Sequence, residues 1–253
     1  VGSEMCIRDR VNPARTKDYA RSLMQRNKTD KADARLLALY CLKHELDLWS
    51  PPPPQMRDLK AMVRRLHTLK TMRQQEKNRL GAGGTTDRVN ASIEQLIAYL
   101  DQEIKELEQA IQEHIDQFPT LREQRALLKS IPGIAKLTAA MLLAEIPDSA
   151  AFDDARQLAA YAGVTPNNQD SGRSVHRKPH MSKKGNAHLR RALYMPAIVA
   201  KQHNPIIRAF CERLEDRGLA AKAVIGAAMH KLLRIAYGVL KHGRPFDPHY
   251  LSN

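Results

Sequence analysis

The chain has 253 residues, of which 43% are hydrophobic, and its formal net charge is +14. That length supports one large domain or two modest ones, with enough apolar residues for a real core. So large an excess of Lys and Arg is unusual for a metabolic enzyme, and it makes a nucleic acid or another polyanion the leading partner.

Several other classes of protein are disfavoured by what the sequence lacks. Its three cysteines, Cys6, Cys41 and Cys211, are widely spaced and form neither a disulfide framework nor a Cys/His zinc pattern, which fits a reducing cytoplasm. We identify no apolar run long enough to cross a bilayer and expect no membrane partner. The absence of a P-loop motif predicts no nucleotide cofactor.

Residues 1–10, VGSEMCIRDR, show no periodicity and resemble translated sequencing-adaptor DNA. We therefore expect these residues to be non-native and the natural protein to begin upstream of them.

A helix is predicted from Lys31 to Leu42, and Asp30 and Asp33 lie three residues apart at its start, on one face. Two carboxylates so placed can share a divalent metal ion with acidic residues from elsewhere. Alternatively, they only stabilise the helix dipole. Four prolines, Pro51–Pro54, end this segment and predict a hinge.

Two longer helices are predicted next, over residues 55–79 and 90–117, with a glycine-rich break from Gly81 between them. The second helix carries a heptad seam, which is typical of a left-handed coiled coil, at Ile93, Ile97, Leu100, Ile104, Leu107 and Ile111. We expect an antiparallel helical hairpin. The seam serves either a contact with a second copy of the chain or an internal bundle.

The remainder, residues 120–248, is predicted to be all helical, with helices near 121–129, 135–146, 154–161, 186–201, 204–216 and 219–242. Strand-like alternation is essentially absent. The turn at Gly133 joins two apolar helices in a helix-hairpin-helix-like pattern, whose backbone N–H groups bind phosphate. An ordinary helix–turn–helix corner is the alternative.

A polar turn in the same region presents Ser171 among many cationic side chains. A serine beside a phosphate-binding surface is what a nucleophile that attacks a phosphodiester needs. The simpler interpretation is a solvated basic loop. Nearby histidines could act as acid or base, but such residues more often add to a basic surface. Our candidates for contact with nucleic acid are Gly133, Arg173, Arg177, Lys183, Lys184 and Arg190.

Five motifs, in order, are distributed along the chain between residues 11 and 248: NKTDKADARLLA, SIPGIAKLTAAMLLAEI, AYAGVTPNNQDSGRSV, MSKKGNAHLRRALYMPA and IAYGVLKHGRPFD. Together they resemble the insertion sequence 110 family of transposases. The resemblance implies an RNase-H-like domain with four acidic Mg²⁺ ligands, a coiled coil, and a transposase domain with a nucleophilic serine. Asp30 and Asp33 match the third and fourth acids, and Ser171 matches the serine.

The motifs of the first two acids are absent, so we expect an N-terminally truncated chain that is inactive alone. The expected fold is mostly α: an RNase-H-like remnant (residues 11–50), a coiled-coil hairpin (51–119) and a C-terminal transposase domain (120–248). The resemblance implies DNA strand exchange through a covalent phosphoserine, a structured guide RNA and a homo-oligomer. The alternatives are a non-catalytic nucleic-acid-binding protein and a metal-dependent nuclease.

Overall fold

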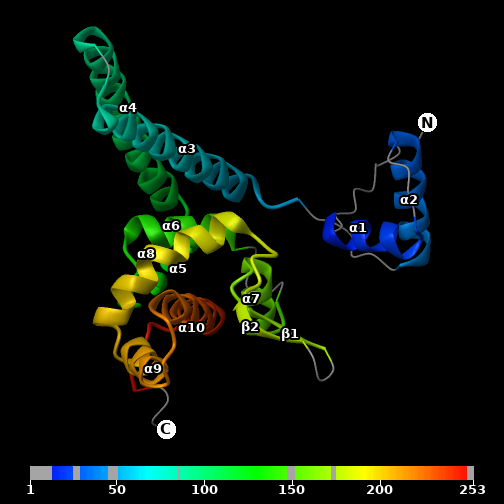
Figure 1. Cartoon of the computed structure of the whole chain (residues 1–253). Coiled ribbons are helices and arrows are strands. Elements are labelled where there is room, and N and C mark those ends of the chain that lie inside the picture. The colour runs from blue at the N-terminus through cyan, green and yellow to red at the C-terminus, as the bar shows by residue number, and fades with distance from the viewer. Residues whose placement is uncertain are drawn as a thin grey trace. The chain divides into compact units, whose positions relative to one another are not determined.

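The computed structural model describes residues 13–24, 29–44, 51–84, 86–146, 152–171 and 175–249. The chain divides into two compact units, Val1–Pro53 and Pro54–Asn253. Helices form most of the described residues in both units, so the prediction of a mostly α protein is confirmed (Figure 1).

The first unit contains the helices α1 (Pro13–Ser22) and α2 (Asp30–Lys43), which contact each other. The side chain of Thr29 caps α2 by accepting a hydrogen bond of 3.2 Å from the Ala32 amide. Between the helices, the rings of Tyr19 and the buried Tyr40 meet edge to face, with centroids 5.3 Å apart. The predicted helix is therefore present, while its assignment to an RNase-H-like domain stays a prediction.

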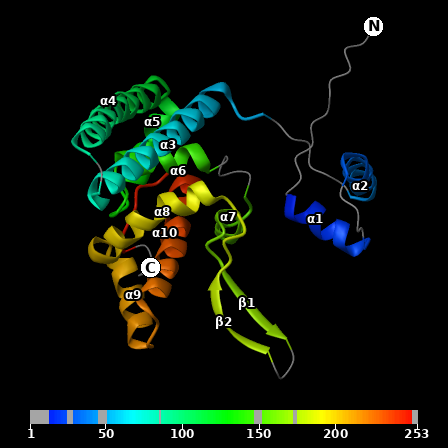
Figure 2. The same ribbon diagram turned by 45° about the horizontal axis from the view of Figure 1, so that its top comes forward.

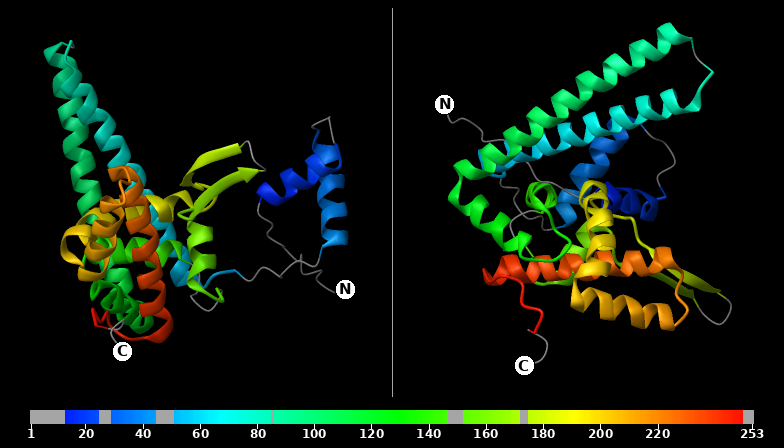
Figure 3. Two further views of the ribbon diagram at one scale, coloured as in Figure 1. Left: turned by 60° about the horizontal axis from the view of Figure 1, so that its bottom comes forward. Right: turned by 90° about the vertical axis from the view of Figure 1, so that its left-hand side faces the viewer.

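The second unit begins with α3 (Pro54–Ala82) and α4 (Asp87–Gln117), which lie side by side as an antiparallel pair (Figure 3). Pro54 is the first residue of α3, a position where the missing amide hydrogen costs nothing. Gly83 and Gly84 follow α3 with φ of +68° and +78°, a conformation that glycine adopts without strain. The predicted helical hairpin is confirmed.

The heptad seam of α4 packs within the chain. Leu100, Ile104 and Ile111 are buried, and they belong to one core with residues of α3, whose buried members are Leu59, Val63, Leu66 and Leu69. Nearer the turn, Ile93 and Ile97 are only half-buried. The contact with α3 accounts for the seam, so association with a second copy stays a prediction.

In the described C-terminal residues six helices follow: α5 (Pro119–Lys129), α6 (Lys136–Glu145), α7 (Ala155–Ala162), α8 (Ala187–His203), α9 (Pro205–Asp216) and α10 (Ala221–His242). Their bounds lie within a few residues of those predicted. Helix α10 contacts α5, α7, α8 and α9, and its Leu232 and Leu233 are fully buried. It is therefore the helix around which this part of the core is built.

By length and composition, α10 is also the one described helix that could cross a membrane, with a mean hydropathy of 1.3 in its most apolar window. The helix thus departs from the expectation that no apolar run in the sequence is long enough to cross a bilayer. Its buried residues, which include Val224, Ala228, Leu232 and Ala236, belong to the core of this unit. This packing is sufficient to explain why the helix is so apolar.

The main departure from prediction is a two-stranded antiparallel sheet, β1 (Pro166–Ser171) and β2 (Val175–Met181) (Figure 2). The expectation of an all-helical C-terminal part without strands was wrong here. Both strands consist mostly of polar residues, so they lack the apolar–polar alternation by which a strand is recognised in sequence. Cross-strand backbone pairing, which composition does not reveal, defines them.

Candidate nucleic-acid interface

Ser171 is the last residue of β1 and pairs with Val175, the first residue of β2. The backbone of Arg177 pairs with Gln169, two positions along the same ladder. The side chains of Ser171 and Arg177 lie outside what the structure describes, and Arg173 lies wholly outside the described residues. The hairpin thus brings the backbone of the predicted nucleophile next to a strand of basic sequence.

The two strands shift register between Asn167 and Gln169. Asn167 pairs with His180 and Gln169 with Arg177, so β2 holds one residue more than β1 in this interval. Pro179 lies inside it, and proline is tolerated in a ladder mainly at such bulges because it has no N–H to donate. The proline therefore explains where the bulge falls.

The foot of the hairpin is held by close backbone contacts with the end of α7. The amide of Lys183 donates to the Gly163 carbonyl at 3.0 Å, and the amide of Asn186 donates to the Tyr161 carbonyl at 2.7 Å. At Gly185 a Cβ atom would lie 2.4 Å from the Tyr161 carbonyl oxygen, so no larger residue fits without movement. The hairpin therefore rises from a closely packed base.

Of the predicted phosphate-binding cations, Lys183 and Lys184 are exposed at this foot. Arg190 is half-buried, and its Nη1 donates to the Ala162 carbonyl at 3.0 Å. Arg190 thus helps to fasten α8 to the end of α7, next to the hairpin. A phosphate contact by any of these three residues stays a prediction.

Gly133 lies in the turn between α5 and α6 and has a φ of +107°. A Cβ atom there would lie 2.7 Å from the Ala200 Cβ and 2.9 Å from the Pro196 carbonyl oxygen, both in α8. The glycine thus permits a close approach of two segments, as the helix-corner interpretation requires. Its role in phosphate binding stays a prediction.

Asp30 and Asp33 both lie in the first turn of α2, where Asp30 is exposed and Asp33 half-buried. Oxygen ligands of this kind suit Mg²⁺. Within the described residues, however, no group of three or more His, Cys, Asp or Glu side chains is placed to hold a metal ion. The pair therefore fits only part of the expected magnesium site.

Sequence reasoning missed a buried carboxylate beneath the hairpin, Glu145, whose side chain is only 2% exposed. Arg64 Nε donates to it at 2.8 Å, Asn186 Nδ2 donates at 2.9 Å, and Lys60 Nζ lies 3.5 Å away. Burial acts to raise the pKa of Glu145, but the Arg64 and Asn186 hydrogen bonds and the Lys60 charge hold the pKa below its usual value. The signal was a lone acid in the apolar run MLLAEI.

A cleft of about 360 Å³ lies between α3, α6 and α8 and was not predicted. Its polar lining comes from all three helices: Arg64, His67, Lys70, Glu145, His188 and Arg191. The rings of His67 and His188 are 6.1 Å apart, and Arg191 Nη1 contacts His67 Nε2. Cationic and titratable groups from three helices thus gather in this cleft.

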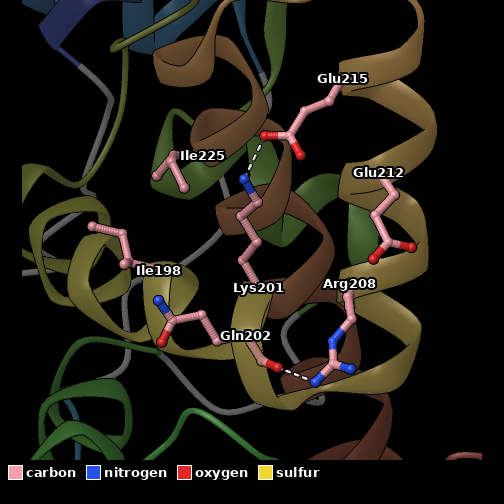
Figure 4. Close-up of a pocket in the computed structure, with 7 residues that line it drawn as sticks. All are labelled: Ile198, Lys201, Gln202, Arg208, Glu212, Glu215 and Ile225. Atoms are coloured by element: carbon pink, nitrogen blue, oxygen red, sulfur yellow. Dashed lines mark hydrogen bonds and ion pairs between the residues drawn. The ribbon is translucent and has the colours of Figure 1, made fainter.

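A second cavity, of about 500 Å³, lies between α8, α9 and α10 (Figure 4). Its Lys201 forms an ion pair with Glu215, and Arg208 donates to the Gln202 carbonyl. Glu212 also lines it, so acids and bases balance. This cavity lacks the positive surplus that a nucleic-acid site needs.

Two family models match the chain. One, described as "Transposase IS116/IS110/IS902 family", matches residues 125–212, which include the β1–β2 hairpin and most of the cleft walls contributed by α6 and α8. The other, described as "Transposase", matches residues 9–82.

Individual relatives agree with these matches. The chain is 37% identical over 238 residues to the "Pilin gene-inverting protein" of Moraxella bovis, across 94% of this chain and 73% of that protein. It is 28% identical over 164 residues to the "Insertion element IS110 uncharacterized 43.6 kDa protein" of Streptomyces coelicolor, across 65% of this chain and 39% of that protein. It is also 28% identical over 173 residues to the "Transposase for insertion sequence element IS1328" of Yersinia enterocolitica.

Proposed function

Because this chain belongs to the IS110 family of transposases, we propose that Ser171 is the nucleophile of its DNA strand exchange. The observation that carries this proposal is the position of Ser171 at the end of β1, in a basic hairpin whose foot is fixed to α7. A nucleophile needs a defined position relative to the phosphate it attacks. The close-packed foot at Gly185 supports such a position.

The proposed chemistry is a reversible transesterification. The Ser171 Oγ loses its proton and attacks a backbone phosphorus, a Ser–O–P bond forms, and the P–O3′ bond breaks, which leaves a free 3′-hydroxyl. A 3′-hydroxyl from another strand then attacks the phosphoserine, a new P–O3′ bond forms, and the serine leaves and regains a proton. Each step exchanges one phosphate ester for another, so no nucleotide cofactor is consumed.

The exposed Lys183 and Lys184 at the foot of the hairpin are the proposed electrostatic contacts for the DNA backbone, together with Arg173 and Arg177. Mg²⁺ is the proposed cofactor, with Asp30 and Asp33 among its ligands, and when bound it stabilises negative charge on phosphate oxygens. The metal-binding role rests on family resemblance and on the pairing of these two acids in one turn.

Two partners of the protein are proposed on the same resemblance, a structured guide RNA and further copies of the chain. A guide that pairs with the target would read its sequence, while the basic protein surface holds the backbone. We propose the bacterial cytoplasm, at the nucleoid, as the place where the protein acts on DNA.

The deciding experiment traps a covalent adduct between the protein and DNA in the presence of Mg²⁺ and guide RNA. Ser171→Ala should abolish the adduct, since no other hydroxyl takes its place. Ser174→Ala, three residues along the same segment, is the matched control and should form the adduct as the unmodified protein does.

The competing functions give different results in this assay. An adduct that survives Ser171→Ala rules out this nucleophile. Cutting that persists in Ser171→Ala but disappears in Asp30→Asn indicates a metal-dependent nuclease that acts through water. DNA binding with neither adduct nor cutting indicates a non-catalytic binding protein.

A further inference from the structure

The cleft between α3, α6 and α8 carries a charge pattern that the proposed chemistry at Ser171 does not use. Arg64 is paired with Glu145, and Lys70 is paired with Glu108 at 2.6 Å. Arg191 takes part in none of the ion pairs formed among the described residues, and it is exposed on α8. Its positive charge therefore remains available to an anion in the cleft.

The two histidines of the cleft add groups that an anion can recruit. Arg191 Nη1 contacts His67 Nε2, so the Arg191 charge lies directly against this imidazole ring. Burial, then the Arg191 charge, then His188, lower the pKa of His67. A bound anion opposes the effect of Arg191 and favours the imidazolium form of His67, which can donate a hydrogen bond to that anion.

The cleft also has an apolar lining from the same three helices. These side chains are Val63, Leu137, Met141, Met195 and Pro196. Helix α6 begins at Lys136, directly beside the cleft, and no side chain caps this end in the described structure. The positive end of its dipole therefore adds to the field of the cations that line the cleft.

The cleft also adjoins the foot of the Ser171 hairpin. Arg190 fastens α8 to the Ala162 carbonyl, and the next residue, Arg191, lines the cleft. Asn186, which caps α8 and ends the hairpin foot, donates to Glu145, another residue of the cleft lining. A strand held in the cleft thus lies close to the base that positions the nucleophile.

We propose that a backbone phosphate of DNA binds in this cleft, in contact with Arg191 and the imidazoles of His67 and His188. This inference rests on the proposed function only for the choice of DNA as ligand. The cavity between α8, α9 and α10 is the contrasting case, because there Lys201 already has a carboxylate partner.

Binding of a labelled DNA duplex, measured by fluorescence anisotropy over a range of salt concentrations, tests the proposal. Arg191→Gln should weaken binding about tenfold and lower the slope of log affinity against log salt by about one, because one phosphate contact is lost. Arg191→Lys should keep the slope, since it keeps the charge. The matched control is Arg65→Gln, on the exposed side of α3 and outside the cleft lining, which removes the same net charge.

A second arm follows pH. Arg64, Lys70, Glu145, His188 and Arg191 line the cleft together with His67, and a phosphate bound among them opposes the Arg191 charge and so raises the pKa of His67. Binding therefore takes up protons, so affinity should rise as the pH falls from about 8 to about 6. The His67→Gln variant should lose part of that gain in affinity, with an unchanged melting temperature as its folding control.

An Arg191→Gln variant that matches Arg65→Gln in both slope and affinity overturns the proposal. The proposal is also overturned if Arg191→Gln weakens binding of an RNA duplex of the same sequence but leaves binding of the DNA duplex unchanged. A serine-dependent adduct combined with an unchanged slope would reject the cleft and leave the proposed function standing. If Arg191→Gln lowers the salt slope but no adduct forms at Ser171, the proposed function is rejected and phosphate binding in the cleft is retained.

Discussion

Glu145 joins three elements through one carboxylate. It lies at the end of α6, accepts from Arg64 of α3, and accepts from Asn186 at the start of α8. Because it is almost fully buried, its two oxygens depend on these partners rather than on water. The helical hairpin and the foot of the β hairpin are therefore tied to the same side chain.

Glu145→Gln should reduce the free energy of unfolding by about 1–3 kcal/mol at neutral pH, since the contacts of Arg64, Asn186 and Lys60 with a negative carboxylate are weakened. The pKa of Glu145 lies below its ordinary 4.5 in the folded protein. Its contribution is thus complete above about pH 4.5 and is lost as the pH falls through the folded-state pKa. Urea unfolding at several pH values from about 3 to about 7 measures the free energy of unfolding of both proteins. The difference between variant and parent should become smaller only at acid pH.

Glu108→Gln is the control for this experiment, because Glu108 pairs with Lys70 near the surface, where 40% of its side chain is exposed. Such a pair contributes about 0–1 kcal/mol. If Glu108→Gln reduces the free energy of unfolding as much as Glu145→Gln does, the buried Glu145 network has no special role in stability.

At the scale of elements, the turn between α5 and α6 shows how a helix corner docks. Its Gly133 touches α8 closely enough that a methyl group would overlap Ala200. The same residue was singled out from sequence for its exposed amides. The packing supplies a second and independent reason for glycine at this position.

Gly133→Ala should destabilise the protein by two effects, backbone strain of about 1–2 kcal/mol at positive φ and overpacking of about 1–3 kcal/mol. Gly84→Ala is the matched control, because Gly84 also has positive φ but nothing lies within 4 Å of a Cβ there. Denaturant unfolding of both variants separates the two effects. If both variants lose the same free energy of unfolding, overpacking against α8 does not contribute to the effect of Gly133→Ala.

The long helices were predictable because apolar residues at three- and four-residue spacing bury one face wherever the helix packs. The β hairpin was not, because neither strand carries a recognisable apolar face. Its form depends on backbone pairing and on the foot at Gly163 and Gly185, which are fixed by contacts between α7 and the segment before α8.

At the scale of the whole molecule, the main hydrophobic core draws its buried residues from Leu59 through Val239, all in the second unit. In the first unit, the buried residues of α2 are Leu36 and Tyr40. A core of this extent is sufficient for an independently folding domain. Three of the four prolines precede Pro54 and mark the boundary between the units.

Residues 54–253 should therefore fold without residues 1–53 and unfold cooperatively, with a melting temperature within a few degrees of the full chain. Thermal unfolding followed by circular dichroism measures this. Loss of the cooperative transition in the shortened chain would show that the second unit depends on the first.

The sequence by itself determined the helices, the helical hairpin and the family, because each is encoded by local periodicity or by contiguous motifs. Tertiary structure alone decided what Gly133 touches, why Glu145 is charged while buried, and which residues line the cleft. The physical reason is distance along the chain: Arg64, Glu145 and Asn186 meet through packing of α3 and α6 with the start of α8, and no local pattern records that meeting.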